Sequence, residues 1–155
     1  MNESSTLLLV DDTESDLFLM RRAFKMAQCD IPVQEVHNGE EAIAYLMGEG
    51  VFADRTKFPL PIVMILDLNM PKKDGFAVLT WVRSQPVLRR LAIIVLSASM
   101  RSQDVERAFD LGANSFLVKP SNLEVLSSMI RCLGDWIQMN HFPSLSVAKR
   151  EMMGR

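Results

Sequence analysis

Five short runs rich in Leu, Ile and Val restrict the fold of this chain more than any other feature of its sequence. The runs lie at residues 6–10, 33–36, 62–66, 92–96 and 115–118. In the three longer runs, at 6–10, 62–66 and 92–96, the apolarity is continuous rather than alternating, which is typical of strands buried on both faces of a parallel sheet. Each run is followed by a segment with apolar residues every three or four positions, such as Leu17, Met20 and Phe24, which predicts an amphipathic helix. Five such alternations predict an α/β fold, a (βα)5 doubly wound parallel sheet with right-handed crossovers.

The composition is that of one ordinary folded domain. Of the 155 residues, 48% are hydrophobic and 23% are charged, which excludes a disordered or low-complexity chain. A net charge of −2 gives no bulk positive field for nucleic acid or anionic lipid, so no nucleic acid and no membrane is expected as a partner. The sequence shows no apolar stretch of about 18 residues and no export signal. Because Cys29 and Cys132 form no metal-binding or disulfide pattern, we expect a cytoplasmic protein.

Two segments interrupt the regular alternation. The connection at 48–61 is about twice the usual loop length, and its apolar Phe52 and Phe58 favour packing onto the surface of the domain rather than exposure to water. After the last helix, residues 138–155 are too few for a second domain. We therefore expect one domain at 1–137, followed by a C-terminal tail at 138–155 with no output domain.

Polar side chains stand where four of the five predicted strands end. Asp11 and Asp12 follow the first strand, Asp67 follows the third, Ser97 ends the fourth and Lys119 follows the fifth. Ligands of open parallel sheets bind at the carboxyl ends of the strands. In the flavodoxin-like strand order 2-1-3-4-5, these four strands are consecutive neighbours. This order therefore gathers all five side chains at one edge of the sheet.

Asp11, Asp12 and Asp67 together predict a cation site. Three carboxylates at one edge repel one another unless a cation neutralises them. Mg²⁺ takes oxygen ligands and keeps positions for phosphate oxygens, so we expect it on these three carboxylates and on a backbone carbonyl near Asn69. A carboxylate can also attack phosphorus and form an aspartyl phosphate. The metal and the polar side chains of the fourth and fifth strands would then stabilise the developing charge.

Four motifs at these strand ends carry a family resemblance. They are Leu9-Val10-Asp11-Asp12, Leu66-Asp67-Leu68-Asn69-Met70-Pro71 with Asp74-Gly75, Leu96-Ser97-Ala98 and Val118-Lys119-Pro120. In this order, over about residues 6–137, they resemble the motifs of bacterial response-regulator receiver domains. The resemblance implies that Asp67 accepts a phosphoryl group from the phosphohistidine of a histidine kinase, while the aspartates after the first strand hold Mg²⁺. It also implies that Ser97 and Lys119 bind the phosphoryl oxygens.

The resemblance further implies a conformational switch. Phe116 stands three residues before Lys119, where the family has an aromatic residue that changes rotamer. When Ser97 moves toward the phosphoryl group, Phe116 would turn into the vacated space and alter the surface around 101–118 and the helix that follows. The peptide bond before Pro120 is expected to be cis, as is frequent in the family.

A narrower resemblance concerns the type of receiver. The residues that carry it are Asp67 to Gly75, Gly39-Glu40-Glu41-Ala42, Tyr45-Leu46 and Trp136, together with the long loop before the third strand. They resemble stand-alone receivers that serve phytochrome-class and related sensor kinases. The resemblance implies a single-domain regulator that acts by phosphorylation-dependent protein contacts and is not an enzyme for other substrates. Its partners would be a sensor histidine kinase or a phosphotransfer protein, and a second copy bound through the fourth helix, fifth strand and fifth helix.

Other functions compete with this interpretation. A phosphorelay intermediate or a scaffold receiver would use the same fold. An Asp-nucleophile phosphatase of the haloacid-dehalogenase type also combines Asp with Mg²⁺, but it needs a second Asp where this chain has Asn69. A nucleotide-binding module is disfavoured because Asp11, Asp12 and Glu14 would repel phosphate. A DNA-binding regulator is disfavoured because the tail contains no helix-turn-helix pattern.

Overall fold

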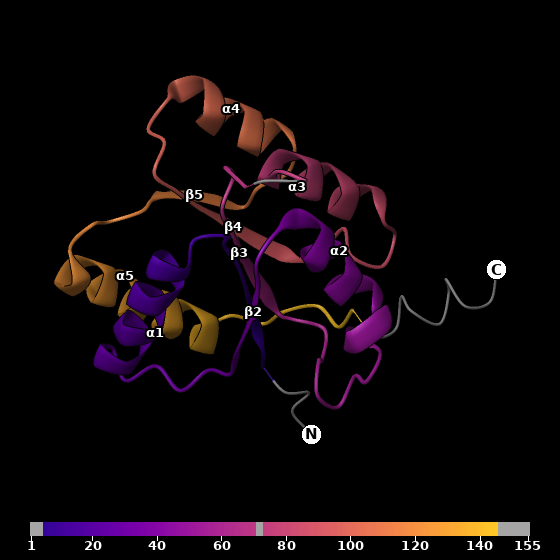
Figure 1. The fold of residues 1–155 in the computed structure, drawn as a ribbon, viewed down its shortest axis with the longest axis horizontal. Helices are drawn as coiled ribbons and strands as arrows, with labels where there is room; N and C mark the ends of the chain where they lie inside the picture. Colours follow the sequence, from indigo (N-terminus) through magenta and orange to yellow (C-terminus); the bar gives the residue numbers. More distant parts are fainter. Residues whose placement is uncertain (1–4, 71–72, 146–155) are drawn as a thin grey trace.

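The computed structural model describes residues 5–70 and 73–145 and shows one sheet of five parallel strands, ordered β2-β1-β3-β4-β5 (Figure 1). The strands are β1 (Leu7–Val10), β2 (Val33–Val36), β3 (Val63–Leu66), β4 (Ala92–Ser97) and β5 (Ser115–Val118). Each strand matches one of the five apolar runs to within one residue at either end. The predicted fold class and strand order are therefore confirmed.

The strands are aligned so that their carboxyl ends meet at one edge of the sheet. Val10 of β1 pairs with Leu66 of β3, and Leu66 pairs with Val95 of β4. Ser97 at the end of β4 pairs with Val118 at the end of β5. The loops that follow these residues therefore begin side by side.

Two layers of helices cover the sheet (Figure 1). The helices are α1 (Glu14–Met26), α2 (Gly39–Met47), α3 (Gly75–Ser84), α4 (Ser102–Asp110) and α5 (Leu123–Met139). Helices α1 and α5 pack together on one face, and α2, α3 and α4 cover the other. Within β1, Leu7 and Leu9 are buried under the α1–α5 layer, whereas Leu8 and Val10 are buried under the α2–α4 layer. Burial on both faces explains why the apolarity of the strands is continuous.

Short polar side chains determine where three of the helices begin. The Asn38 side chain accepts a 2.8 Å hydrogen bond from the backbone N–H of Glu41 at the start of α2. Asp74 accepts a 2.9 Å bond from the N–H of Ala77 at the start of α3, and Asn122 does the same for two amides of α5. These bonds satisfy N–H groups that have no partner within the helix, which explains the start of each helix.

The long connection after α2 folds back onto that helix. It begins with a short 3₁₀ helix, η1 (Gly50–Phe52). The rings of Tyr45, Phe52 and Phe58 form one aromatic cluster, with centroids 5.1 to 6.0 Å apart. The Arg55 guanidinium donates hydrogen bonds to backbone carbonyls at the end of α2. The predicted packing of the two phenylalanines onto the domain is confirmed.

The chain continues to pack against the domain after α5. Phe142 meets Trp136 edge to face, with ring centroids 5.6 Å apart. Phe142 packs against the α1–α5 layer, whereas Leu145 is buried in the α2–α4 layer. The segment between them passes from one layer to the other, as the yellow trace in Figure 1 shows. The domain boundary at residue 137 stays a prediction, and residues 146–155 of the predicted tail lie outside the described residues.

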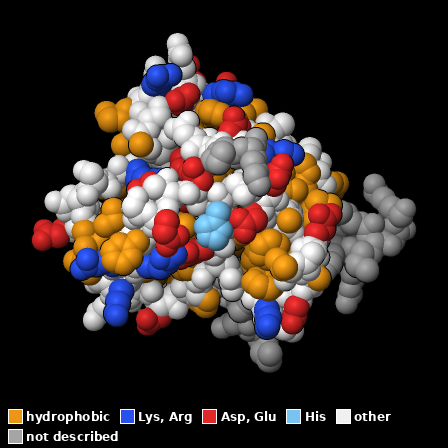
Figure 2. Space-filling view, in the orientation of Figure 1, with side chains coloured by type: hydrophobic (Ala, Val, Ile, Leu, Met, Phe, Trp, Pro, Cys, Tyr) orange, Lys and Arg blue, Asp and Glu red, His pale blue; other side chains and the backbone are white. Residues whose placement is uncertain are grey.

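Among residues 5–70 and 73–145, no helix combines the length and the apolarity that a membrane crossing requires. Figure 2 shows acidic and basic side chains interspersed among exposed hydrophobic ones. Arg21 on α1 illustrates this local pairing, because its guanidinium contacts Glu14 at 3.0 Å and Glu35 at 2.6 Å. Exposed pairs of this kind contribute little to stability, so the fold depends mainly on the two apolar layers.

Candidate functional site

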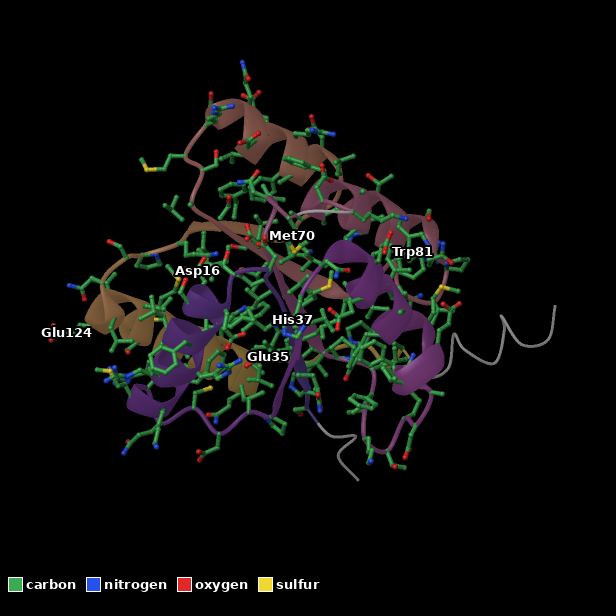
Figure 3. All side chains as sticks on the ribbon, in the orientation of Figure 1. Asp16, Glu35, His37, Met70, Trp81 and Glu124 are labelled. Carbon is green, nitrogen blue, oxygen red and sulfur yellow. The ribbon has the colours of Figure 1, made fainter. Side chains whose placement is uncertain are left out.

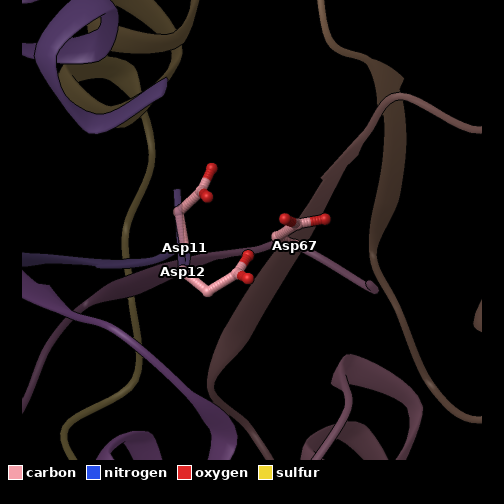
Figure 4. A group of neighbouring side chains, drawn as sticks. All are labelled: Asp11, Asp12 and Asp67. Atoms are coloured by element: carbon pink, nitrogen blue, oxygen red, sulfur yellow. The ribbon is translucent and has the colours of Figure 1, made fainter. Parts of the chain in front are cut away.

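Three aspartates from the ends of β1 and β3 form one cluster (Figure 4). One carboxylate oxygen from each of Asp11, Asp12 and Asp67 lies within 4.8 Å of the others. Asp11 and Asp67 are 2% and 7% exposed, whereas Asp12 is open to solvent. Mg²⁺ prefers oxygen ligands and keeps several waters, which fits a cluster that is buried on one side and open on the other. The structure thus brings together the three predicted metal ligands.

The loop after β3 holds the Asp67 carboxylate in place. The backbone N–H of Asn69 donates a 3.2 Å hydrogen bond to Oδ1 of Asp67. Gly75, the first residue of α3, donates its N–H to the Leu68 carbonyl at 3.0 Å. A Cβ atom at Gly75 would collide with the carbonyl oxygen of Asp67, so glycine allows α3 to begin against this loop. The role of the Asn69 carbonyl as a metal ligand stays a prediction.

Lys119, which follows β5, brings a positive charge to the cluster. Its Nζ lies 2.8 Å from Oδ2 of Asp11 and 3.7 Å from Oδ2 of Asp67, and its side chain is 13% exposed. The Lys119 backbone N–H donates a 2.8 Å hydrogen bond to the Ser97 carbonyl, which extends the β4–β5 pairing to the site. Residues from the ends of four neighbouring strands, β1, β3, β4 and β5, therefore meet at this edge, as the strand order predicted.

Burial and charge act in opposite directions on the two central groups. Burial raises the pKa of the Asp67 carboxyl above its ordinary value, and the positive charge of Lys119 offsets only part of this rise. Burial lowers the pKa of the Lys119 ammonium, but its hydrogen bond to Asp11 and the charge of Asp67 outweigh burial and raise that pKa to about 12. Lys119 is therefore charged at neutral pH, and a further cation would stabilise the ionised form of Asp67.

Ser97 and Phe116 lie on the neighbouring strands β4 and β5. Ser97 is fully buried, and its Oγ accepts a 3.2 Å hydrogen bond from the backbone N–H of Ser99. Phe116 is partly buried and packs against the α2–α4 layer. The roles of both residues in phosphoryl binding and in the switch stay predictions.

The predicted cis bond before Pro120 is wrong. No peptide bond among the described residues is cis, so the bond between Lys119 and Pro120 is trans. The cis form was expected from the family resemblance, and it would have aimed the ammonium inward. The Lys119 side chain reaches Asp11 at 2.8 Å from a trans bond, so the inward direction needs no cis geometry.

A fourth carboxylate at the site was missed by the sequence analysis. Asp16, in the first turn of α1, accepts a 3.0 Å hydrogen bond from the Lys119 Nζ. Figure 3 shows Asp16 where α1 begins, beside the strand ends. The two residues are 103 positions apart, so no local pattern links them. The available signal was an acidic residue in the first turn of the helix that directly follows Asp11 and Asp12.

This combination of fold and site defines a class of protein: a flavodoxin-like domain with an acidic cluster and an ion-paired lysine at the carboxyl edge of its sheet. Residues 7–131 match the family model described as the response regulator receiver domain. The chain therefore belongs to the receiver family of two-component signalling proteins.

Comparison with individual proteins agrees with this family. The response regulator Rcp1 of Synechocystis sp. is 31% identical over 144 residues, which are 92% of this chain and 96% of Rcp1. The crystal structure of the phosphorylated cyanobacterial phytochrome response regulator RcpA superposes with a TM-score of 0.81 and 34% identity, covering 92% of this chain and 100% of that chain. The Mn²⁺-bound form of Rcp1 superposes with a TM-score of 0.79 and 31% identity, covering 90% and 99%. The chain is thus similar to phytochrome-associated regulators over most of its length.

Proposed function

We propose that Asp67 accepts a phosphoryl group, in a Mg²⁺-dependent reaction, from the phosphohistidine of a sensor histidine kinase or a phosphotransfer protein. The observation that carries the proposal is the Lys119 ammonium, which lies between Asp11 and Asp67 beside the carboxylate cluster. Membership of the receiver family supports the same function. In this proposal the protein works in the cytoplasm and catalyses only its own phosphorylation and dephosphorylation.

The proposed transfer uses an Asp67 carboxylate oxygen as the nucleophile. This oxygen attacks phosphorus, the O–P bond forms as the P–N bond of the phosphohistidine breaks, and the imidazole nitrogen keeps the electron pair. The Lys119 ammonium, 3.7 Å from Oδ2 of Asp67, is close enough to bind the oxygens of the new phosphoryl group together with the Ser97 hydroxyl. The three clustered aspartates and the Asn69 carbonyl would hold Mg²⁺, which supplies positive charge to the phosphoryl oxygens when bound.

The relatives support both the metal and the donor in this proposal. A Mn²⁺-bound form of Rcp1 has been solved, which supports a divalent cation at the corresponding acidic cluster of this chain. RcpA is a phytochrome response regulator, which supports a phytochrome-class kinase as the phosphoryl donor.

The proposed output surface is formed by α4, β5 and α5. Each of these elements exposes a large apolar side chain, namely Phe109, Val118 and Val125. Exposed apolar side chains that gather on one surface favour protein contacts. Because Phe116 lies on β5, its rotation would change this surface when Asp67 is phosphorylated. We therefore propose that phosphorylation controls pairing of two copies, or binding of another protein, through this surface.

Intact-mass spectrometry after incubation with acetyl phosphate tests the proposed function. Wild type should gain one phosphoryl group in the presence of Mg²⁺ and none with EDTA. The Asp67→Asn variant should gain none, whereas Asp30→Asn, which changes an exposed aspartate, should behave as wild type. The proposal fails if Asp67→Asn is still modified, or if wild type gains no phosphoryl group from either acetyl phosphate or a phosphorylated kinase.

A further inference from the structure

We propose that Asp16 is a positioning residue that holds the Lys119 ammonium on the α1 side of the site and so leaves the aspartate cluster free to bind a divalent cation. This inference rests on the proposed function, because it concerns the same cation site. It goes further by giving a role to a carboxylate outside the metal-binding cluster.

The Lys119 ammonium is shared between two carboxylates at nearly equal distances. Its Nζ lies 2.8 Å from Asp11 and 3.0 Å from Asp16, and farther, at 3.7 Å, from Asp67. Asp16 is 33% exposed and does not belong to the group of aspartates whose oxygens lie within 4.8 Å of one another. Asp16 therefore binds the lysine without being placed to bind the cation.

Both carboxylate oxygens of Asp11 are already engaged. Oδ1 accepts a 2.9 Å hydrogen bond from the backbone N–H of Thr13, and Oδ2 accepts the bond from Lys119. A cation that binds Asp11 therefore shares its oxygens with these donors and comes close to the ammonium, and the two positive charges repel each other at short range. The ammonium is mostly buried, so it cannot simply move into water.

Asp16 provides the acceptor that the ammonium needs when a cation binds Asp11 and weakens the Lys119–Asp11 bond. The Lys119–Asp16 hydrogen bond is already formed, so weakening the bond to Asp11 leaves the ammonium with an anionic acceptor. Without Asp16, Lys119 would depend on Asp11 and Asp67, and every cation that bound there would compete with it directly. The Asp16 carboxylate should therefore increase the affinity of the site for a divalent cation.

The test is the affinity of the unphosphorylated full chain for Mn²⁺, measured by electron paramagnetic resonance of the free ion. Asp16→Asn should weaken Mn²⁺ binding by about tenfold, a typical loss for a residue that supports the metal site without touching the metal. The matched control is Glu14→Gln, which removes the same charge from the same helical turn but breaks a pair with Arg21 instead. The control should change the affinity less than about twofold, since an exposed charge outside the cluster is screened by salt.

A double-mutant cycle separates positioning from simple charge. If Asp16 acts through the ammonium, Asp16→Asn in a Lys119→Met background should change the Mn²⁺ affinity no more than Glu14→Gln does. The inference is overturned if Asp16→Asn matches Glu14→Gln in the wild-type background, if it strengthens binding, or if its full effect persists without Lys119. A wild type that binds no Mn²⁺ would overturn the proposed cation site as well, so the two failures are distinguishable. Because Asp16 is partly exposed in the first turn of α1, we expect Asp16→Asn to fold, and far-ultraviolet circular dichroism checks this.

Discussion

The Ser99 hydroxyl donates a 2.6 Å hydrogen bond to the Asp104 carboxylate and so ties the β4–α4 loop to the first turn of α4. The same hydroxyl oxygen accepts a 3.3 Å bond from the backbone N–H of Arg101, the residue just before the helix. Arg101 makes no side-chain cap of its own. Ser99 therefore stabilises the start of α4 from outside the helix, two residues after the predicted phosphoryl-binding Ser97.

Removing this hydroxyl should loosen α4 without preventing phosphorylation. We expect Ser99→Ala to cost about 1 to 2 kcal/mol of local stability, because the bond involves a charged acceptor. Amide hydrogen exchange over residues 99–106 should become faster, while the phosphoryl group still forms on Asp67. Ser102→Ala, at an exposed position in α4, is the control and should leave the exchange rates near those of wild type. Equal exchange rates in Ser99→Ala and Ser102→Ala would show that the Ser99–Asp104 hydrogen bond does not stabilise the start of α4.

Phosphorylation should change the surface around α4 and β5 only when the Phe116 ring is present. In Phe116→Ala the phosphoryl group should still form on Asp67, but no ring can fill the space that Ser97 leaves. A nearly complete switch requires about 5.5 kcal/mol of differential stabilisation, enough for a clear change in hydrogen exchange. Exchange over residues 101–118, with and without acetyl phosphate and Mg²⁺, should respond in wild type and much less in the variant.

The matched control for Phe116 is Phe18→Ala, which removes an exposed ring from α1, outside the proposed output surface. This control should keep the phosphorylation-dependent change in exchange, because its ring does not border the space beside Ser97 in the proposed switch. If Phe116→Ala responds to phosphorylation as strongly as wild type does, the proposed coupling is wrong.

Asp67→Asn should stabilise the metal-free protein at neutral pH. Burial raises the pKa of Asp67 in the folded state above its unfolded value, so the folded state binds the proton more tightly. Protonation of Asp67 therefore stabilises the folded state. This contribution is fully present below the pKa of Asp67 in the unfolded chain and is lost as the pH rises through its pKa in the folded protein. The variant should therefore exceed wild type in free energy of unfolding at pH 7, and the difference should shrink as the pH falls toward about 4. Urea titrations in the presence of EDTA, at pH values between about 4 and 7, measure this difference in the free energy of unfolding.

Mg²⁺ should reverse this order of stability. Binding to the folded state alone adds about 2.7 kcal/mol when the free ion is at 100 times its Kd, and wild type should gain more than Asp67→Asn. Asp30→Asn serves as the control and should follow wild type at each pH and Mg²⁺ concentration. A variant that is less stable than wild type in EDTA at pH 7 would show that the Lys119 contact outweighs burial.

The sequence was sufficient to predict the fold because its main signals are local. Strands β1, β3 and β4 are continuous apolar runs, and three helices start at an Asn or Asp whose side chain caps them. The strand order then places Asp11, Asp67 and Lys119 at one edge of the sheet. These predictions depend on burial and periodicity, which a single sequence records directly.

The parts of the site that could not be predicted depend on tertiary geometry. Asp16 meets Lys119 only because α1 starts at the edge where β5 ends, and the direction of a first-turn side chain does not follow from composition. The bond before Pro120 is trans, the isomer that most X–Pro bonds adopt, and Lys119 still reaches Asp11 at 2.8 Å. Arg55 likewise gave no signal in the sequence, since an arginine in a polar loop is ordinarily exposed.

Arg55 is the residue that holds the long loop to α2, and its removal should destabilise the domain without affecting phosphorylation. Its guanidinium donates bonds of 2.7 and 2.8 Å to the carbonyls of Tyr45 and Leu46 and one of 3.0 Å to Phe58. Arg55→Ala would remove all three of these hydrogen bonds, at a cost of about 3 kcal/mol. Lys57→Ala, which removes the same charge from an exposed position of the loop, should cost less than about 0.5 kcal/mol. Urea unfolding measures both variants, and equal midpoints would show that the loop is held by its aromatic rings rather than by Arg55.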